Sequence, residues 1–526
     1  MGKKNRRIAV LDFETDPFKH GRIPVPFAWG FYDGERYVEH WQSKAWETPG
    51  ECEKILAEFL LDQEVEYVCY AHNGGKFDFM FLLEWIEGTL KIVNGRILQA
   101  KINNVTLRDS YAILPIPLAQ AGDKLDIDYM LMERQCREDH KEEILRYQKQ
   151  DCIALFELVS AFIEEFGDIL TIGSASMKQL KKFHDYDSAN EYFDAQFRKF
   201  YFGGRCQCFE TGVIDTTVKG FDLNSSYPYT MKSMMHPVST EFSITGNVGK
   251  KTAFVSWEGK NYGAVPTRTK TGLDFTLEDG VFHSTIHEFN AGLETGTIRP
   301  HKILEAYHFT KLVSFQDFIE HFYFSRLAAK KAGNKFLDIF YKLILNSAYG
   351  KFAQNPEGFE DYIILPYGDV PPEPFTLSQQ NGKYAIWSKP SNMRTFYNVA
   401  AAASITGGSR ATLLRGLSQA TRPLYCDTDS IYCEDFSGKL DDKELGAWKH
   451  EFTGNQIAIA GKKLYAVMGE KDGQQVCLKK ASKGTRLNPL AIFMIARGDT
   501  CETFNDAPAF KLDGNHQFVK RAIRRT

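Results

Sequence analysis

The N-terminal third of the chain alternates short apolar strands with amphipathic helices, and this alternation restricts the fold more than any other feature. IAVLDFE and PFAWGFYD are predicted to be strands, residues 50–62 a helix, EYVCYA a further strand, and 138–166 a long helix with apolar residues at helical spacing. Strands and helices in alternation are typical of α/β domains. We therefore predict an α/β domain over residues 1–170.

The remainder of the 526-residue chain is long enough for further domains. A polar stretch at 171–190 is predicted to be a linker, and 235–310 is rich in Gly, Thr and short β-like runs. A strong helix is predicted at 335–353, a Pro/Gly-rich β segment at 354–392, and a hairpin at PLYCDTDSIYCED, after an Ala-rich helix. The fold class predicted is a multidomain mixture of α/β and α+β.

Charge is distributed unevenly along the chain. The net charge is -3, yet residues 461–526 hold 13 Lys and Arg against 6 Asp and Glu. A basic tail after an acidic front suits a protein that holds metals in one region and phosphates in another. A merely solvated basic tail would look the same.

The cysteines and the apolar runs indicate the cellular setting. Ten cysteines are scattered without a CxxC pair, which favours reduced thiols over a disulfide framework. No apolar run approaches the ~18 residues of a membrane span. We expect no membrane partner and a cytoplasmic protein.

Four acids in the first domain lie in positions that could hold metal ions. Asp12 and Glu14 are two residues apart on a predicted strand, so they share a face. Asp78 begins DFMFLLEWI, which is predicted to be a helix, and Asp151 follows Tyr147 by one helical turn. Hydrolysis of a phosphodiester by two divalent ions needs such hard oxygen ligands, and Tyr147 could orient the attacking water. Any one of these acids alone could be an ordinary surface residue.

Three further acids suggest a second site. Asp222 ends a predicted strand, and Asp427 and Asp429 lie at the tip of the predicted hairpin. Two acids at a hairpin tip repel each other unless cations neutralise them. With Asp222 beside them, they could hold two ions that join a 3′-hydroxyl to the α-phosphate of a nucleotide.

Two other segments could bind the substrates of such a reaction. Lys342, Asn346 and Tyr349 form one helical stripe, where the lysine could meet a triphosphate and the tyrosine a base. YFGGR, at 201–205, opens the backbone for close approach to a phosphate strand. A polar helix face and a β-turn are the alternatives.

These segments resemble the motifs of family B DNA polymerases in the same order along the chain. DFET, HNGGKFD and YQKQD resemble the three exonuclease motifs. DLNSSYP, KLILNSAYGK and YCDTDS resemble motifs A, B and C, YFGGR resembles the YxGG motif, and KKLY resembles the KxY motif. The resemblance implies an RNase H-like 3′→5′ exonuclease followed by a right-hand polymerase with palm, fingers and thumb. The implied activity is DNA-directed DNA synthesis with proofreading.

The resemblance also implies roles for individual residues. Asp12, Glu14, Asp78 and Asp151 would be the exonuclease metal ligands, assisted by Tyr147. Asp222, the Leu223 carbonyl and Asp429 would hold the polymerase metals, and Asp427 would lie at the primer terminus. Each site would take two Mg²⁺ or Mn²⁺ ions.

Substrate contacts follow from the same resemblance. Tyr227 would exclude ribonucleotides, Lys330 or Lys331 together with Lys342 would bind the triphosphate, and Tyr349 the nascent pair. The positions that match DNA contacts are Thr15, His72, Asn73, Phe77, Ser110, Tyr201, Gly203, Gly204, Arg205, Ser225, Asn346, Gly350, Lys351, Thr428, Lys463, Tyr465 and Lys480.

Two departures from the family pattern are visible. The loop Gly74-Gly75-Lys76 is one residue longer than is usual in the small-phage polymerases. Ser226 stands where these polymerases commonly carry leucine. We expect the first to alter the shape of the loop and the second to have a small effect.

Two long separations point to a subgroup. Tyr227 and Asn346 are 119 residues apart, and Gly350 and Asp427 are 77 apart. These gaps resemble the two insertions of the protein-primed polymerases of small bacteriophages and linear plasmids. By that resemblance, 235–315 would dock a terminal protein, and 354–392 would close over the template and give processivity and strand displacement. The rest divides into palm (171–234 and 393–485), fingers (316–353) and thumb (486–526).

Three alternatives remain open at the level of sequence. The chain could be a family B polymerase that uses nucleic-acid primers, a DEDD exonuclease with a degenerate polymerase region, or a non-catalytic strand-binding protein. The protein-primed reading implies a monomer that works in a host cell, expected to be bacterial. Its partners would be template-primer DNA, dNTPs and a terminal protein.

Overall fold

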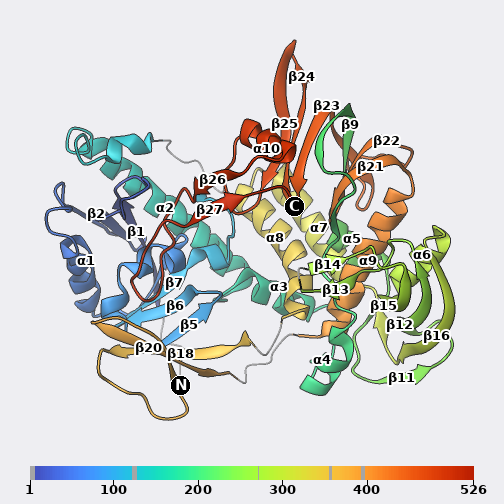
Figure 1. Ribbon diagram of the computed structural model, residues 1–526. Coiled ribbons are helices and arrows are strands. Elements are labelled where there is room, and N and C mark those ends of the chain that lie inside the picture. The colour runs from blue at the N-terminus through green and yellow to red at the C-terminus, as the bar shows by residue number, and fades with distance from the viewer. Residues whose placement is uncertain (1–5, 121–126, 271, 355–357, 392–396) are drawn as a thin grey trace.

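The structure is a computed structural model that describes residues 6–120, 127–270, 272–354, 358–391 and 397–526. The chain forms an N-terminal α/β domain, a central sheet with helices, and a smaller β domain on the opposite side (Figure 1). The multidomain α/β and α+β fold class is thereby confirmed.

The N-terminal domain is built on one mixed sheet. Its strand β1 pairs in parallel with β4, and β4 with β7, whereas β2 and β3 continue it antiparallel on one side and β6 and β5 on the other. The elements are β1 (Arg7–Thr15), β2 (Pro26–Tyr32), β3 (Tyr37–Trp41), α1 (Glu51–Leu61), β4 (Tyr67–Ala71), β5 (Gly88–Val93), β6 (Arg96–Ile102), β7 (Val105–Asp109) and α2 (Lys141–Phe166). The α/β prediction for this part is correct.

The segment DFMFLLEWI is not a helix, contrary to the prediction. It forms two short 3₁₀ turns, η2 (Asp78–Met80) and η3 (Leu83–Trp85). Phe79, Met80 and Leu82 are all buried, so apolar side chains point inward around most of the segment and leave little polar face for a surface helix.

The second predicted insertion extends the sheet of the N-terminal domain. Its strands β18 (Glu360–Pro366), β19 (Thr376–Gln380) and β20 (Tyr384–Pro390) join through β18, which pairs antiparallel with β5 and sets Tyr362 opposite Leu90. Ile364 and Ile386 pack into the same core as Leu90. Ten strands, ordered β19-β20-β18-β5-β6-β7-β4-β1-β2-β3, therefore form one sheet from segments far apart in sequence (Figure 1).

Residues 172–180 are helical, so the linker prediction is wrong for this part. Helix α3 (Ile172–Leu180) is capped by Thr171, whose side chain accepts from the Ser174 amide at 3.1 Å. Met177 and Leu180 are fully buried, and the Ser176 hydroxyl donates to the Ile344 carbonyl at 2.6 Å. The segment fixes the N-terminal domain to the helices that follow.

The centre of the molecule is a seven-stranded sheet ordered β25-β24-β23-β9-β22-β21-β8. Its strands are β8 (Cys206–Cys208), β9 (Gly212–Leu223), β21 (Ala420–Asp427), β22 (Ser430–Phe436), β23 (Trp448–Gly461), β24 (Leu464–Lys471) and β25 (Gln474–Ser482). The helices beside it are α5 (Ser226–Ser233), α7 (Gln316–Lys331), α8 (Lys335–Phe352) and α9 (Val399–Leu417). The predicted hairpin, the 335–353 helix and the Ala-rich helix are all confirmed.

The first predicted insertion is mainly a four-stranded sheet. Its strands are β11 (Phe242–Thr245), β12 (Thr252–Asn261), β15 (Asp279–Thr285) and β16 (Ile298–Phe309), with the helix α6 (Ile286–Glu294) between the last two. Val255, Trp257 and Phe282 form part of its core together with Leu414 of α9. Smaller elements are α4 (Glu191–Arg198), β10 (His236–Pro237), β13 (Thr267–Thr269), β14 (Gly272–Asp274) and β17 (Leu312–Val313).

The C-terminal segment returns from the central sheet to the N-terminal domain. After α10 (Pro489–Arg497), the paired strands β26 (Cys501–Phe504) and β27 (Lys520–Ile523) are joined by a loop that reaches the N-terminal domain (Figure 1). The Phe510 ring lies 5.2 Å from the Phe77 ring and 5.4 Å from the Phe81 ring. The Tyr384 hydroxyl donates to the Leu512 carbonyl at 2.8 Å, so this loop also touches the second insertion.

Candidate active sites

Strand β1 gathers the acids of the N-terminal domain. The Phe13 amide, between Asp12 and Glu14, donates to the Asp78 carboxylate at 3.1 Å. The Gln148 side chain of α2 donates to the Asp12 carbonyl at 3.3 Å, which holds the α2 turn that carries Tyr147 and Asp151 against the strand. Three separate elements thus converge on one place.

The electrostatics agree with this convergence. Burial, followed by repulsion from Asp109, raises the pKa of Asp78 to about 7. The pKa of the Cys152 thiol is raised by burial and then by the charges of Asp12, Asp151 and Glu14, so all three acids lie near this thiol. Burial and the Asp151 charge raise the pKa of Tyr147, which therefore stays protonated.

The expected strand-contacting residues lie at the edge of this group. His72 bonds through Nδ1 to the Ser110 hydroxyl and through Nε2 to the Ile116 carbonyl, both at 3.0 Å. Asn73 has a positive φ of 64°, and a Cβ on Gly75 would lie 1.9 Å from the Ile97 carbonyl oxygen. Gly75 of the longer loop is thus required for its close approach to β6.

Thr15 and Phe77 complete this edge. Thr15 is buried, with its hydroxyl donating to the Asp16 carbonyl at 3.2 Å, and Phe77 is half-buried among aromatic rings that include Phe510. Phe77 therefore meets the C-terminal segment as well as the group of acids.

Sequence reasoning missed several residues that support the acidic group. Asp16 is fully buried and pairs with Arg134 at 2.7 Å and with Arg137 at 2.9 Å. The Tyr129 hydroxyl lies 2.9 Å from the Tyr147 hydroxyl. The available signal was Asp16 itself, a third acid directly after DFET, but its two arginines lie more than a hundred residues away.

The second group of acids lies at the meeting of β9, β21 and β22. Asp222 is opposite Ser430 in the β9–β22 register, and the Leu223 amide donates to the Asp429 carbonyl at 2.7 Å. Burial, then repulsion from Asp222 and Asp427, raises the pKa of Asp429 to about 7. Asp222 and Asp429 therefore lie together, as the sequence predicted.

Lys463 and Tyr465 of KKLY belong to the same neighbourhood. The Lys463 ammonium donates to the Asp427 carboxylate, and its amide donates to the Tyr425 hydroxyl at 3.1 Å. The Tyr465 hydroxyl lies 2.7 Å from that of Tyr432. Asp222 lies beside Asp429, and Lys463 offsets the negative charge of Asp427, the other acid at the hairpin tip.

The loop at 201–205 packs directly on the hairpin tip. A Cβ on Gly204 would lie 2.5 Å from the Thr428 hydroxyl oxygen, and the Thr428 amide donates to the Arg205 carbonyl at 2.6 Å. Gly203 is exposed and Tyr201 half-buried. Arg205 is only 4% exposed, with its guanidinium 4.3 Å from the Phe275 ring, so its side chain faces protein.

Tyr227 and Tyr349 face each other. Their rings are stacked with centroids 3.8 Å apart and an interplanar angle of 18°, which joins α5 to α8. Beside them, Ser225 adopts a positive φ of 54°. Ser226 is buried, with its hydroxyl 2.7 Å from that of Ser409 in α9, so the polar residue in place of leucine has a partner.

The remaining expected contacts are on or near exposed surfaces. Lys330, Lys331, Lys342 and Asn346 are exposed on α7 and α8. A cavity of about 600 Å³ lies between α8 and the N-terminal domain, and its lining includes Lys76, Arg96, Asn346, Tyr349, Gly350 and Lys351. The Lys480 ammonium donates to the Leu487 carbonyl at 3.1 Å.

The acids fit divalent cations that share ligands with a substrate. Within the described residues, no three Asp, Glu, His or Cys side chains are grouped so that they alone could hold a metal ion. Mg²⁺ is usually held by one or two carboxylates and completes its shell with water and substrate phosphates. Asp222 and Asp429 meet that requirement, and a cation between them would relieve the repulsion that raises the Asp429 pKa.

Two groups of acids, one on the mixed sheet of the N-terminal α/β domain and one at the hairpin of the central sheet, are the candidate catalytic centres. The family model for DNA polymerase type B, organellar and viral, matches residues 123–381. The DNA-directed DNA polymerase of Enterobacteria phage PRD1 is 49% identical, covering 100% of this chain and 99% of that protein. The chain belongs to the type B DNA polymerases of organelles and viruses, and it is a DNA-directed DNA polymerase.

More distant relatives agree with the fold. The DNA polymerase of Bacillus phage phi29 is 24% identical over 90% of this chain and 88% of that protein. The solved structure of Phi29 DNA polymerase with primer-template DNA superposes with a TM-score of 0.73 at 21% identity, covering 99% of this chain and all of that one. Among the described residues, no helix is both long enough and apolar enough to cross a membrane.

Proposed function

We propose that the hairpin site is the nucleotidyl-transfer centre of a replicative polymerase. The observation that carries this is the β9–β22 junction, where the Leu223 amide donates to the Asp429 carbonyl and Asp222 raises the pKa of Asp429. Asp222, Asp429 and the Leu223 carbonyl would hold two divalent ions, Mg²⁺ or Mn²⁺. When bound, such ions favour attack by the 3′-hydroxyl and neutralise charge on the transferring phosphate.

The chain's own residues bind and orient the two substrates. Asp427 and Lys463 lie at the primer terminus. Lys342, with Lys330 or Lys331, attracts the triphosphate from the exposed faces of α8 and α7. The Tyr227–Tyr349 stack forms the floor under the incoming sugar and base, where Tyr227 excludes a 2′-hydroxyl.

The β1 site is the proofreading centre. Asp12, Glu14, Asp78 and Asp151 would hold its ions, and Tyr147, which stays protonated, can donate toward the attacking water. His72, Asn73, Phe77, Ser110 and Thr15 receive the frayed single strand. The cavity that Lys76, Arg96 and Lys351 line lies between α8 and the N-terminal domain and offers a basic surface to DNA.

Priming by a terminal protein is supported by the two insertions. Residues 235–315 form a separate sheet that a protein primer can approach. Residues 358–390 attach to the exonuclease sheet, which holds them beside the path of the template and suits processive, strand-displacing synthesis. The polymerase acts as a monomer in the cytoplasm of a bacterial host.

A primer-extension assay with Mg²⁺ tests the division of labour. Asp429→Asn is expected to lower extension by about three orders of magnitude or more, because a metal ligand is lost, and to leave degradation of single strands unchanged. Asp12→Asn combined with Glu14→Gln should do the reverse. Asp435→Asn is a matched control: it is exposed on the same hairpin, pairs with Lys219, and should change neither activity.

Loss of both activities in both variants, with unchanged melting temperatures, would contradict the assignment. Protein priming has its own assay. A small protein encoded beside this chain should become covalently nucleotidylated when it is mixed with the polymerase, Mg²⁺ and dNTP. A polymerase that extends DNA primers but labels no such protein uses nucleic-acid primers instead.

A further inference from the structure

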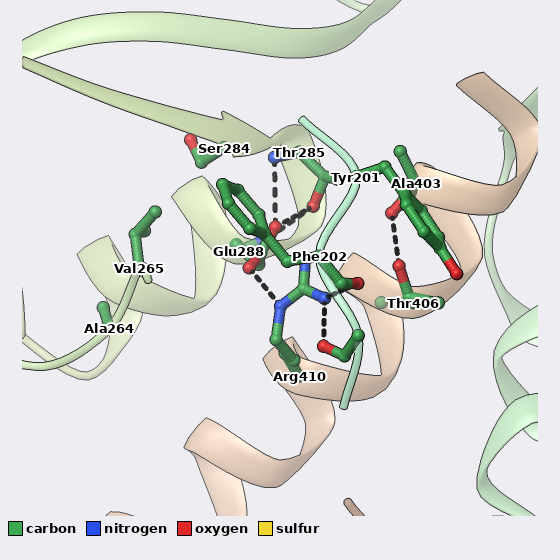
Figure 2. A network of polar contacts seen from close by, with 12 residues as sticks. Tyr201, Phe202, Ala264, Val265, Ser284, Thr285, Glu288, Ala403, Thr406 and Arg410 are labelled. Atoms are coloured by element: carbon green, nitrogen blue, oxygen red, sulfur yellow. Dashed lines mark hydrogen bonds and ion pairs between the residues drawn. The ribbon is translucent and has the colours of Figure 1, made fainter. Parts of the chain in front are cut away.

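A buried ion pair joins the first insertion to the polymerase centre. The Arg410 Nε of α9 lies 2.7 Å from Glu288 Oε1 of α6, and each side chain is 1% exposed (Figure 2). Buried charges are expensive to remove from water, so a pair of this kind is held only where further hydrogen bonds support both partners. Both partners here have such bonds.

Glu288 is fixed from the side of the insertion. Its Oε2 accepts from the Thr285 amide at 3.1 Å and from the Thr285 hydroxyl at 2.9 Å, while the Glu288 amide donates back to that hydroxyl at 3.2 Å. These bonds form the capping box of α6. One carboxylate oxygen therefore caps the helix, and the other is left for Arg410.

Arg410 carries the connection to the loop at 201–205. Its Nη1 donates to the carbonyl oxygens of Phe202 and Gly203, at 2.5 and 2.7 Å (Figure 2). Gly203 has no side chain to hold it, and a Cβ there would meet nothing within 4 Å. The Arg410 guanidinium thus holds Gly203 in place through its backbone carbonyl, because Gly203 has no side chain that could do so.

The loop transmits this placement to the catalytic hairpin. Gly204 packs against Thr428 without room for a Cβ, and the Arg205 carbonyl accepts from the Thr428 amide. Thr428, with a positive φ of 58°, separates Asp427 from Asp429. A shift of the loop would therefore move the turn that sets these two carboxylates.

The close approach of α9 to α6 shows how the contact is built. A Cβ on Gly407 would lie 2.3 Å from the Thr285 hydroxyl oxygen and 2.8 Å from Glu288 Oε2. Only glycine permits this separation, which lets Arg410, three residues on, reach the capping carboxylate. The α9 backbone at Gly407 therefore lies directly against two side chains of the insertion.

We propose that Glu288 is a positioning residue for the polymerase reaction: through Arg410 it fixes the loop that places Thr428 and its neighbouring acids. This inference rests on the polymerase role of the hairpin site. It assigns the first insertion a part in ordinary nucleotide addition, in addition to any part in priming.

The first test compares Glu288→Gln with Glu294→Gln. Glu294 also joins α6 to α9, through an exposed pair with Arg415 at 2.6 Å, but touches nothing at the loop. Glu288→Gln is expected to lower kcat for nucleotide addition roughly 10- to 100-fold, since small misplacements of reacting groups have effects of that size. The KM for dNTP should stay within about twofold because the lysines of α7 and α8 are untouched. Glu294→Gln should behave as wild type.

A second variant separates positioning from simple stabilisation. Replacing both partners, as Glu288→Met with Arg410→Met, removes the buried charges together and should recover the melting temperature that Glu288→Gln loses. It should not recover kcat, because without Arg410 the Phe202 and Gly203 carbonyls lose their donor. Single-strand degradation in the N-terminal domain should be unchanged in every variant and confirms that the chain is folded.

Equal kcat values for Glu288→Gln and Glu294→Gln overturn the proposal. Recovery of kcat together with melting temperature in the double variant also overturns it, since the pair would then only stabilise the fold. Failure of the wild-type chain to extend a primer is a different result, which would contradict the polymerase assignment itself.

Discussion

At the scale of single residues, the buried histidine His236 shows how the fold depends on a protonation state. Its Nε2 lies 2.9 Å from the Thr230 carbonyl, which can only accept, so this nitrogen carries the proton and Nδ1 accepts from the Ser404 hydroxyl at 2.9 Å. Burial, then the nearby His287, lowers the pKa of His236 to about 3. The histidine is therefore neutral in the folded chain.

This pKa predicts acid sensitivity. Above the unfolded value of 6.5 the histidine is neutral in both states and contributes no pH dependence. As the pH falls below 6.5 the unfolded chain binds the proton first, so stability declines by up to about 1.4 kcal/mol per pH unit. The melting temperature of His236→Gln should vary less than that of wild type between pH 6.5 and 4. Identical pH profiles for the two proteins would contradict this account.

The residues that sequence could predict are those within compact motifs. Strand and hairpin patterns placed Asp222, Asp427 and Asp429 at the ends of their elements. The resemblance to motifs A and C predicted that these elements meet, and in the structure they do. Glu288 and Arg410 could not be foreseen as partners. They are 122 residues apart, and a glutamate at the third position of a helix normally indicates only a capping box.

At the scale of elements, β18 decides where the second insertion lies. The strand pattern over 354–392 was readable, but pairing with β5 depends on an edge roughly 270 residues earlier, about which local periodicity says nothing. The linker prediction failed for a similar reason. Lys178 of α3 and Lys181 and Lys182 just after it are exposed and give the segment a polar composition, while Met177 and Leu180 are buried by a partner outside it.

A charge placed in the β18 core should detach the insertion. Ile364 is 1% exposed, and an unpaired buried carboxylate costs about 3 kcal/mol or more, enough to shift a docking equilibrium about 100-fold. Ile364→Asp is expected to shorten products on double-stranded templates while extension on open templates continues. The control is Leu377→Asp, on the outer strand β19 and 45% exposed, which should leave product length unchanged.

If Ile364→Asp makes full-length products on double-stranded templates, the proposed role of the insertion in strand displacement is wrong. If Ile364→Asp also loses extension on open templates, the insertion is needed for polymerase activity in general and not only for strand displacement. Gel analysis of product lengths with excess unlabelled template as a trap distinguishes these results.

At the scale of the whole molecule, the loop between β26 and β27 ties the C-terminal region to the N-terminal domain. Phe510 packs on Phe77 and Phe81, and its loop accepts a hydrogen bond from Tyr384. Phe510→Ala removes the aromatic anchor, so the loop should open more often and trypsin should cut at Lys511 several times faster. Tyr192→Ala, at a 77% exposed position, should not alter the cleavage rate.

Mass spectrometry of timed digests measures the cleavage at Lys511 directly. An unchanged rate for Phe510→Ala would mean that the polar contacts hold the loop without the ring. Faster cleavage at Lys511 together with slower degradation of single strands would show that the loop also holds Phe77 in the position where it contacts the single-stranded DNA end.

The ten-stranded sheet also limits how the chain can be divided. A fragment that ends at residue 170 would keep β5 but lose β18, leaving one edge of Gly88, Thr89 and Leu90 without its neighbouring strand and uncovering the Leu90 side chain. Bare strand edges of this kind recruit further strands from other molecules. The isolated nuclease half should therefore self-associate, and a soluble version would have to carry a graft of residues 358–390.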